Sequence, residues 1–460
     1  MPTWPLAVAL AAFIRLVAQP RALLNDPDTY LHIAAGNWIA AHRALPVADP
    51  FSYTMAGARW IPGEWLAELC WAAIYHVAGW SGVVVAAATC VAVSSWLLCH
   101  FVARRIGGLP AATAAVAGVA LVLPHAVARP HLLAMPLLVL WSGALVRARD
   151  DDRPPPWGLL AIAALWANLH ASVLFGLGLA GWLAAEAVVS GSRSRWRWAV
   201  FVLAAACVGL LTPNGIETYL QPLRLMAMPA LQGSFGEWLP PSLLEFPALG
   251  MWLVGLVAAS LLLDVRLNLS RLGLLLLLIY MALSHVRHAD LLGLVGPLVA
   301  ASAFGERVSS RPAGAPRAPA VALVLALAAA AALPLAAKPL ARDGDAVSPA
   351  AALTEARRLG LSGPVFNGEG FGGYLAFAGV PDFIDGRVEL FGNEFLAEDV
   401  AAEGGDPVSL PRVLDRYGVT WTLLAPQAGA IAVLDRLPGW RRVYADPVAV
   451  IHVRATQGSR

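Results

Sequence analysis

The feature that most restricts the fold of this chain is a series of apolar segments, each about as long as a membrane-crossing helix. Of its 460 residues, 58% are hydrophobic and only 13% are charged, and the mean hydropathy is +0.66. Soluble domains carry about 25% charged residues, whereas a helix that crosses a membrane needs roughly 20 apolar residues. We therefore predict a polytopic α-helical membrane protein with about eleven transmembrane helices. The predicted spans are 4–20, 80–103, 110–128, 131–147, 157–169, 171–190, 198–212, 247–263, 271–286, 289–305 and 319–337.

The composition also excludes some functions. The formal net charge is only +2, and no basic patch carries interleaved aromatic side chains, so we expect no nucleic-acid partner. The N-terminus lacks a basic region before its apolar run, so residues 4–20 are interpreted as a retained first span and not as a cleaved signal peptide. The cysteines lack the spacing of metal ligands and are interpreted as small buried side chains. They are Cys70, Cys90, Cys99 and Cys207.

Basic residues predict the orientation in the membrane. Alternate loops between the spans are rich in arginine, and these loops all fall on one side, which the positive-inside rule makes cytoplasmic. The long first loop, 21–79, and everything after residue 337 then lie outside. This loop is rich in tryptophan, which favours the headgroup layer, so we expect its helices to lie along the membrane surface. The arginines are Arg104, Arg105, Arg147, Arg149, Arg153, Arg193, Arg195, Arg197, Arg266, Arg271, Arg307, Arg311 and Arg317.

The C-terminal part is predicted to form a separate soluble domain. Residues 1–340 contain all the predicted spans, whereas residues 345–460 have ordinary polarity. Helical patterns alternate there with short strand-like runs, which is typical of a small α/β domain, here on the periplasmic side. The helical patterns are 348–359, 395–403, 409–417 and 427–437, and the strand-like runs are 364–366, 382–384, 419–424, 442–444 and 448–453.

Two aspartates follow directly on the first span, in Asn25-Asp-Pro-Asp-Thr-Tyr-Leu-His-Ile-Ala-Ala-Gly36. Pro27 is well tolerated where a helix starts, and a helix from Asp28 would place Asp28, His32 and Gly36 on one face. Carboxylates at the rim of a bilayer lose water and hydrogen-bond partners, which favours a functional site. The alternative is that Asp26 and Asp28 merely cap the helix.

Polar residues of the other outer loops extend this candidate site. With the predicted orientation they converge on one side, and we expect a polar cavity at the outer leaflet, because each would be costly in lipid unless paired or hydrated. Arginine and histidine at span ends can also simply extend toward water. However, these residues lie on the outer side of the membrane, whereas basic residues normally gather on the inner side, and this favours a role in anion binding. Glu68 is interpreted as part of a solvated helix face. The candidate substrate-binding residues are His32, Glu64, Arg129, His131, Asn168, His170, Arg287 and His288.

The C-terminal domain contains a further candidate cluster, formed by Asn367, Asp385, Arg387 and Glu389 beside a glycine-rich run around Tyr374. Glycine permits tight turns and close backbone approach. Asp385 and Arg387 are candidates for contact with an acceptor, and the alternative is that the two residues only fix a turn.

Together these motifs resemble bacterial members of the glycosyltransferase C superfamily, which are relatives of the dolichyl-phosphate-mannose protein mannosyltransferases and of the lipid A aminoarabinose transferase. The resemblance covers nearly the whole chain. The Asp-Pro-Asp sequence departs from the Asp-Glu pair of the protein mannosyltransferases, which leaves open which aspartate is the base. The motifs are Asp26-Pro-Asp28 with His32 and Gly36, Asp49-Pro-Phe-Ser52, Glu64-Trp-Leu66, Trp166 with Asn168 and His170, Thr212-Pro-Asn-Gly215, Arg287-His288, and Phe366-Asn with Gly372-Gly-Tyr374 and Phe383-Ile-Asp-Gly-Arg387.

The resemblance implies that a sugar is moved, with inversion, from a polyprenyl-phosphate-linked donor to an extracytoplasmic glycan, lipid or protein acceptor at the bacterial inner membrane. It also implies that Asp26 or Asp28 serves as general base, or as a metal or acceptor contact. The chemistry of the residues fits independently. Glycosyl transfer needs a base for the proton of the acceptor and positive charge near the departing phosphate, which Arg129, Arg287 and His288 can supply.

Three questions stay open at this point. Two carboxylates separated by one residue, such as Asp26 and Asp28, can hold Mg²⁺ or Mn²⁺ instead of acting as a base. A lipid or polysaccharide transporter or flippase is an alternative function, although repeated halves are not found and the polar residues cluster at one rim. A non-catalytic membrane assembly protein of the same fold is a second alternative.

Overall fold

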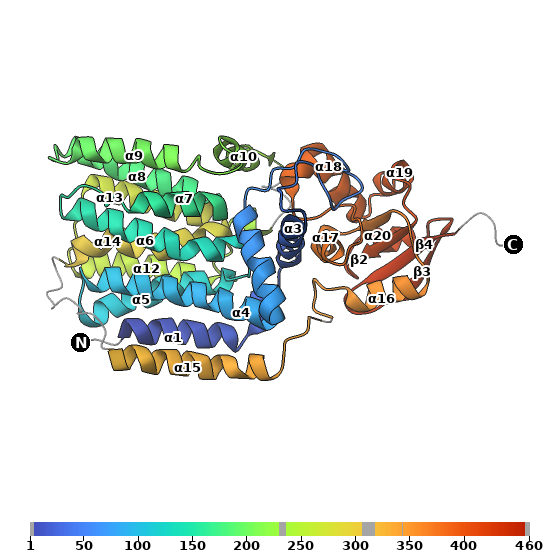
Figure 1. Cartoon of the computed structure of the whole chain (residues 1–460), viewed down its shortest axis with the longest axis horizontal. Coiled ribbons are helices and arrows are strands. Elements are labelled where there is room, and N and C mark those ends of the chain that lie inside the picture. The colour runs from blue at the N-terminus through green and yellow to red at the C-terminus, as the bar shows by residue number, and fades with distance from the viewer. Residues whose placement is uncertain (1–3, 230–235, 306–317, 343, 456–460) are drawn as a thin grey trace. The chain divides into compact units, whose positions relative to one another are not determined.

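The computed structural model describes residues 4–229, 236–305, 318–342 and 344–455, and these are mostly helical (Figure 1). The chain divides into two compact units. The helical unit comprises Met1–Leu23, Val84–Tyr219 and Phe235–Lys338, and the mixed unit comprises Leu24–Val83, Leu220–Ser234 and Pro339–Arg460. The long first loop of the sequence therefore groups with the C-terminal part of the chain and not with the membrane spans.

Each predicted span corresponds to a helix, as expected for long runs of Ala, Leu and Val. In the described part of the chain, five helical segments are long and apolar enough to cross a membrane, and the other helices at predicted spans have 11 to 17 residues. The five are Trp65–Ala103, Gly108–His125, Pro130–Asp150, Val286–Gly305 and Ala318–Ala337. The predicted spans 157–169 and 171–190 form two separate helices, with His170 between them.

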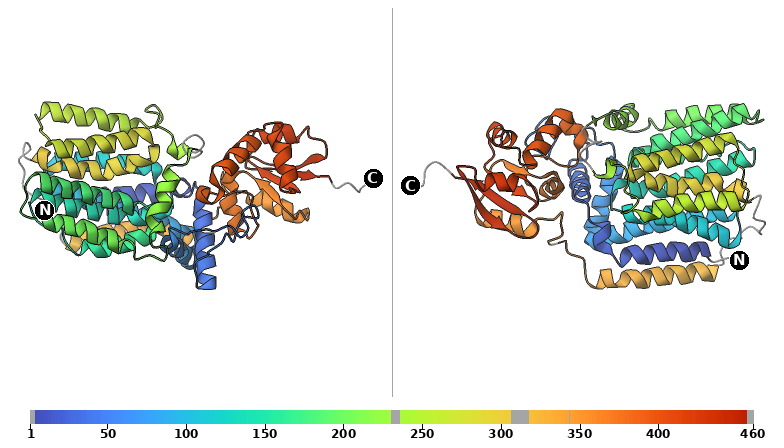
Figure 2. Two further views of the ribbon diagram at one scale, coloured as in Figure 1. Left: turned by 90° about the horizontal axis from the view of Figure 1, so that it is seen from above. Right: turned by 180° about the vertical axis from the view of Figure 1, so that it is seen from behind.

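The helices of the helical unit run broadly parallel to one another (Figure 2). They are α1 (Trp4–Val17), α2 (Pro20–Leu23), α4 (Trp65–Ala103), α5 (Gly108–Val122), α6 (Pro130–Asp150), α7 (Leu159–Leu169), α8 (Val173–Val189), α9 (Arg195–Val208), α12 (Pro247–Leu262), α13 (Leu269–Ser284), α14 (Ala289–Gly305) and α15 (Ala318–Ala337), with short 3₁₀ turns η1 (Leu123–His125), η2 (Gly236–Trp238) and η3 (Val286–His288). Most of α10 (Glu217–Met226) belongs to the mixed unit. α4 begins in the mixed unit, and its backbone leaves the helical conformation at Ala78 and Gly79, just before the predicted span.

Glycines allow α5 and α14 to pack closely. A Cβ atom on Gly118 would lie 2.2 Å from the carbonyl oxygen of Gly293, and one on Gly293 would lie 2.5 Å from the carbonyl oxygen of Gly118. Neither distance is possible for a real side chain, so the two backbones touch only because both residues lack one. Small residues at such crossings are common in membrane helices, where close packing replaces the hydrophobic effect as the driving force.

The arginine-bearing connections meet at one end of the helical unit. Arg105 lies 2.6 Å from Asp151, while Arg271 lies 2.9 Å from Asp150 and 3.0 Å from Glu186. Arg271 is only 3% exposed, and its charge is tolerated because two carboxylates neutralise it. Of the arginines used to predict the orientation, Arg307, Arg311 and Arg317 lie outside the described residues.

The mixed unit contains a four-stranded sheet in its described part. The strands are β1 (Val365–Asn367), β2 (Trp421–Leu424), β3 (Trp440–Ala445) and β4 (Val450–Arg454), in the order β1-β2-β4-β3. β1 and β2 are parallel, and the other two pairs are antiparallel. Its helices are α3 (Asp28–His42), α16 (Ala350–Arg358), α17 (Glu369–Phe377), α18 (Val388–Glu403), α19 (Ser409–Arg416) and α20 (Ala430–Leu434). Apolar side chains of α16 and α17 pack with those of the sheet to form a core.

The sequence interpretation missed one helix and placed one strand wrongly. α17 forms in the glycine-rich run, where glycine disfavours a helix but permits close approach. A Cβ atom on Gly372 would lie 2.0 Å from the carbonyl oxygen of Ile384, so packing overrides the weak propensity. The strand-like run 382–384 lies outside the sheet and forms only an isolated bridge between Asp382 and Ser52.

Candidate active site

The two aspartates at the start of α3 have different surroundings. Asp26 is 8% exposed, and its Oδ1 accepts a hydrogen bond of 2.8 Å from the backbone N–H of Asp28. The capping interpretation therefore fits Asp26. Asp28 is the first residue of α3, and its carboxylate lies against the backbone of Gly386, where a Cβ atom would be 2.0 Å from Asp28 Oδ1.

His32 lies one turn further along α3 and faces Glu64, just before α4, and Glu68, in the first turn of α4. Its Nε2 is 4.0 Å from Glu64 and its Nδ1 is 3.7 Å from Glu68, which are ion-pair distances beyond hydrogen-bond reach. Gly36 allows this approach, since a Cβ atom there would lie 2.1 Å from the carbonyl oxygen of Glu68. The predicted common face of Asp28, His32 and Gly36 therefore forms part of a packed interface between α3 and α4.

The acidic neighbours determine the charge of His32. Burial disfavours the protonated imidazole, but Glu68, Glu64 and Asp28 outweigh this effect and raise the pKa of His32. Glu68 is only 4% exposed, so its assignment to a solvated face was wrong. Glu68 follows Glu64 by four residues, as His32 follows Asp28, and this shared spacing could have indicated that the two pairs face each other.

A second cluster joins the first loop to the C-terminal part of the mixed unit. The guanidinium of Arg387 donates to Asp385 through Nε and Nη2, at 2.9 and 2.5 Å, and to Asp49 through Nη1 at 2.6 Å. It lies 5.1 Å from the ring centre of Phe51 and 4.7 Å from that of Trp60. Trp60, expected in the headgroup layer, is instead buried here.

Arg387 and Asp385 are thus buried and satisfied by each other. The backbone N–H of Arg387 also donates to Asp385 Oδ1 at 2.9 Å, which is the turn that the sequence offered as an alternative to acceptor contact. Burial opposes the charge on Arg387, but Asp385 and Asp49 raise the pKa of the guanidinium. Asn367 is fully buried and holds the neighbouring segment, because its amide donates to the carbonyl of Ile384 and accepts from the N–H of Phe383.

In the helical unit, a carboxylate joins two of the predicted anion-binding arginines. Glu237 lies 3.0 Å from Arg129 and 3.2 Å from Arg287, with one carboxylate oxygen toward each guanidinium. Burial raises the pKa of Glu237, but the two arginines more than offset this and hold it below its usual value. Arg287 also lies 4.6 Å from the ring centre of Trp238. The pairing of Glu237 with the two arginines was not predicted, because Glu237 is far from both along the chain.

The other candidates in the helical unit gather in two pairs. The rings of His131 and His170 are 6.3 Å apart, and those of His285 and His288 are 5.2 Å apart. His170 Nδ1 lies 2.7 Å from the hydroxyl of Ser172. Asn168 donates from its amide to the carbonyl oxygens of Ala164 and Leu211 and so connects the ends of two helices. These polar residues all lie in turns at helix ends.

The structure therefore brings the predicted residues together in two groups, one in each unit. The group in the mixed unit contains no third donor suited to complete a metal site with the aspartates, because no set of three or more His, Cys, Asp or Glu side chains in the described residues could hold a metal ion. The mixed-unit group is Asp26, Asp28, His32, Glu64, Asp385 and Arg387. The helical-unit group is Arg129, His131, Asn168, His170, Arg287 and His288.

No protein-family model matches this sequence, and no curated protein sequence matches it. Among solved structures, the chain is similar to ArnT from Cupriavidus metallidurans bound to undecaprenyl phosphate. The TM-score is 0.51 at 15% sequence identity, and the match covers 98% of each chain. This similarity supports the expected likeness to the lipid A aminoarabinose transferase at the level of the fold. The chain is therefore a polytopic membrane protein with a small C-terminal α/β region, and its fold is similar to that of ArnT.

Proposed function

We propose that this protein is a glycosyltransferase that moves a sugar from a polyprenyl-phosphate-linked donor to an acceptor outside the cytoplasm. The observation that carries the proposal is the similarity to ArnT, which extends over 98% of both chains. The ArnT structure contains bound undecaprenyl phosphate. A fold by itself hosts many functions, so the proposal rests equally on the residues at the site.

In the proposed reaction, Asp28 is the general base. The acceptor hydroxyl oxygen forms a bond to the anomeric carbon of the sugar, the bond from that carbon to the lipid phosphate breaks, and Asp28 takes the hydroxyl proton. A single displacement of this kind inverts the anomeric centre. We favour Asp28 because it is close enough to His32 to raise the pKa of that imidazole, whereas Asp26 Oδ1 accepts the backbone N–H at the start of α3. His32 balances the charge of the carboxylates around it.

Arg129 and Arg287 are proposed to bind the phosphate of the donor. Guanidinium groups bind phosphate through paired hydrogen bonds and stabilise the charge that grows on the leaving group. In the structure Glu237 lies between them, with one oxygen toward each. We infer that the donor phosphate takes the place of Glu237, and that His131, His170, Asn168 and His288 contribute further polar contacts.

The metal expectation leads to a separate experiment. If Asp26 and Asp28 held Mg²⁺ or Mn²⁺, the metal would neutralise charge on the phosphate. As a general base, Asp28 needs no metal. A metal held by the two aspartates would take its other ligands from the donor phosphate and water, since no set of three or more His, Cys, Asp or Glu side chains in the described residues could hold one. Treatment with EDTA is expected to leave turnover unchanged, and loss of turnover that Mn²⁺ restores would instead assign the aspartates as ligands.

The location and the acceptor complete the proposal. We propose from the positive-inside rule that the arginine-rich loops are cytoplasmic, so that the first loop and the residues after 337 are in the periplasm of a bacterial inner membrane. The mixed unit is then on the side where a glycan, lipid or protein acceptor would be found. Because Asp385 and Arg387 are buried, we assign them to the support of the first loop and not to direct acceptor contact.

Purified protein in lipid nanodiscs tests the proposal, with short polyprenyl-phosphate sugars as donors and release of the lipid phosphate as the signal. Asp28→Asn is expected to lower turnover at least about 100-fold, which is the usual contribution of a general base. Asp26→Asn is expected to have a smaller effect, and Asp415→Asn, at an exposed position, none. The proposal is falsified if no donor is turned over or if Asp28→Asn and Asp26→Asn both retain full activity, as a non-catalytic assembly protein would.

A further inference from the structure

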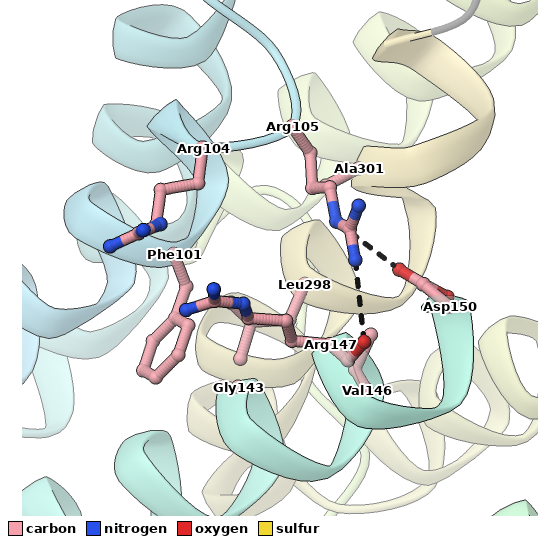
Figure 3. A pocket seen from close by; sticks show the side chains of 9 residues that line it. All are labelled: Phe101, Arg104, Arg105, Gly143, Val146, Arg147, Asp150, Leu298 and Ala301. Carbon is pink, nitrogen blue, oxygen red and sulfur yellow. Dashed lines mark hydrogen bonds and ion pairs between the residues drawn. The ribbon is translucent and has the colours of Figure 1, made fainter. Parts of the chain in front are cut away.

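A shallow pocket lies at the arginine-bearing end of the helical unit, between the end of α4, the second half of α6 and α14 (Figure 3). The space in it amounts to about 290 Å³, including the part open to solvent. Arg129 precedes α6 and Arg147 lies near its end, so a helix rise of 1.5 Å per residue separates them by roughly 27 Å. The pocket is therefore distinct from the proposed donor-phosphate site.

The charges around this pocket are only partly compensated. Arg105 is occupied by Asp150 at 3.6 Å and Asp151 at 2.6 Å. Arg104 has no acidic partner in the described part of the chain and contacts only the imidazole of His100 at 3.3 Å. Arg147 has a single long contact of 3.8 Å to Asp151, which Arg105 holds more closely, and its own side chain is 44% exposed.

The two incompletely paired arginines extend to the same side of the pocket, next to the ring of Phe101 (Figure 3). The rest of the lining consists of the Arg105–Asp150 ion pair and of small or apolar residues, among them Val146 and Leu298. Gly143 makes room for the aromatic ring, since a Cβ atom there would lie 2.3 Å from Phe101. Two guanidinium groups above an apolar floor fit an amphiphile that has an anionic head and a hydrocarbon tail.

We propose that this pocket binds the phosphate of an anionic membrane phospholipid, with Arg104 and Arg147 as the ligands. Two helices that are long and apolar enough to cross a membrane, α4 and α6, end at this pocket, and basic pockets between transmembrane helices recognise anionic head groups. Guanidinium groups pair with both non-ester oxygens of a phosphodiester. The proposal does not depend on the transferase activity, and it predicts a structural lipid at the end of the protein opposite to Arg129.

Native mass spectrometry of the detergent-solubilised full chain tests this proposal. Phosphatidylglycerol is expected to stay bound and to raise the unfolding temperature, whereas phosphatidylcholine with the same acyl chains is not. Arg104→Gln combined with Arg147→Gln is expected to weaken phosphatidylglycerol binding at least about tenfold. The matched control, Arg195→Gln combined with Arg197→Gln, removes two exposed arginines from the start of α9 and is expected to bind as wild type does.

Three results would overturn the proposal. The first is equal loss of lipid binding in the control variant, which would indicate a diffuse electrostatic effect. The second is unchanged phosphatidylglycerol binding in the pocket variant. If the double variant does not fold, Arg104→Gln alone, at an exposed residue, is used to measure this binding instead. The third is displacement of the lipid by millimolar inorganic phosphate, which would identify a site for the free ion and not for a phospholipid.

Discussion

Asp382 and Asp385 are buried carboxylates only three positions apart, but their hydrogen-bond partners differ. Both are fully buried, but Asp385 pairs with Arg387, whereas neither carboxylate oxygen of Asp382 has a hydrogen-bond partner within the described residues. Burial, together with the charges of Asp385 and Asp49, raises the pKa of Asp382 well above its usual value in spite of Arg387. Folding therefore favours the protonated form of Asp382.

This contrast predicts opposite effects of two similar substitutions. A carboxyl whose pKa is raised by folding destabilises the protein as the pH rises toward and through its folded-state pKa. Asp382→Asn removes this cost and is expected to raise the free energy of unfolding by about 1 kcal/mol or more near pH 8, with a smaller gain near pH 5. Asp385→Asn breaks a buried ion pair and is expected to lower it by about 3 to 5 kcal/mol. Thermal unfolding at the two pH values measures both, and a loss of stability in Asp382→Asn at each pH would contradict the account.

Glu237 leads to a prediction about ligand binding at the same scale. If the donor phosphate must replace Glu237 between Arg129 and Arg287, Glu237→Gln removes a competing charge. The affinity of the Glu237→Gln variant for undecaprenyl phosphate is expected to be about fivefold to tenfold higher than that of the wild type. Intrinsic tryptophan fluorescence during titration gives the dissociation constant, and Glu245→Gln, an exposed carboxylate of the same connection, is the control. Weaker binding in Glu237→Gln would mean that Glu237 positions the arginines instead.

At the scale of helices, the contact between α5 and α14 depends on glycine at both positions. Because a Cβ atom on Gly118 would lie 2.2 Å from the backbone of α14, any larger residue must separate the helices. Gly118→Leu is expected to lower stability by about 1 to 3 kcal/mol, the usual cost of overpacking. Gly178→Leu on α8 is the matched control, since nothing lies within 4 Å of a Cβ atom there. Similar unfolding temperatures for the two variants would show that α5 and α14 separate without cost.

Helices that are encoded by a pattern within their own segment, such as an apolar run or a helical spacing of polar residues, were predicted well from the sequence. The apolar runs fixed the positions of the spans, and the spacing of Asp28, His32 and Gly36 fixed one face of α3. The partners of these residues were not predictable in the same way. Glu68 was assigned to solvent because the packing of α3 on α4 is not visible in either segment, and α17 was missed because close packing outweighs the low helix propensity of its glycines.

At the scale of the whole molecule, contacts between distant segments define the mixed unit. Tyr53 donates to the carbonyl of Val365 at 3.0 Å, Thr54 donates to that of Phe383 at 2.6 Å, and Asp49 binds Arg387. More than 300 residues separate these partners along the chain, and no periodicity in either segment encodes the pairing. The sequence placed a boundary near residue 340 on composition alone, whereas the structure builds one compact unit from both sides of it.

The last prediction concerns the folding of this unit. A fragment of residues 345–460 alone would keep the Arg387–Asp385 pair but lose the hydrogen bond from Arg387 to Asp49 and the cover that Trp60 provides, and the loss of such buried contacts is strongly destabilising. We therefore expect this fragment to lack a cooperative thermal transition and to be degraded rapidly in limited proteolysis. A fusion of residues 24–64 to it through a flexible linker is expected to restore the transition, and the same fusion with Asp49→Ala is expected to restore less. Cooperative unfolding of the isolated fragment would mean instead that the C-terminal region is a domain on its own and that the first loop only covers it.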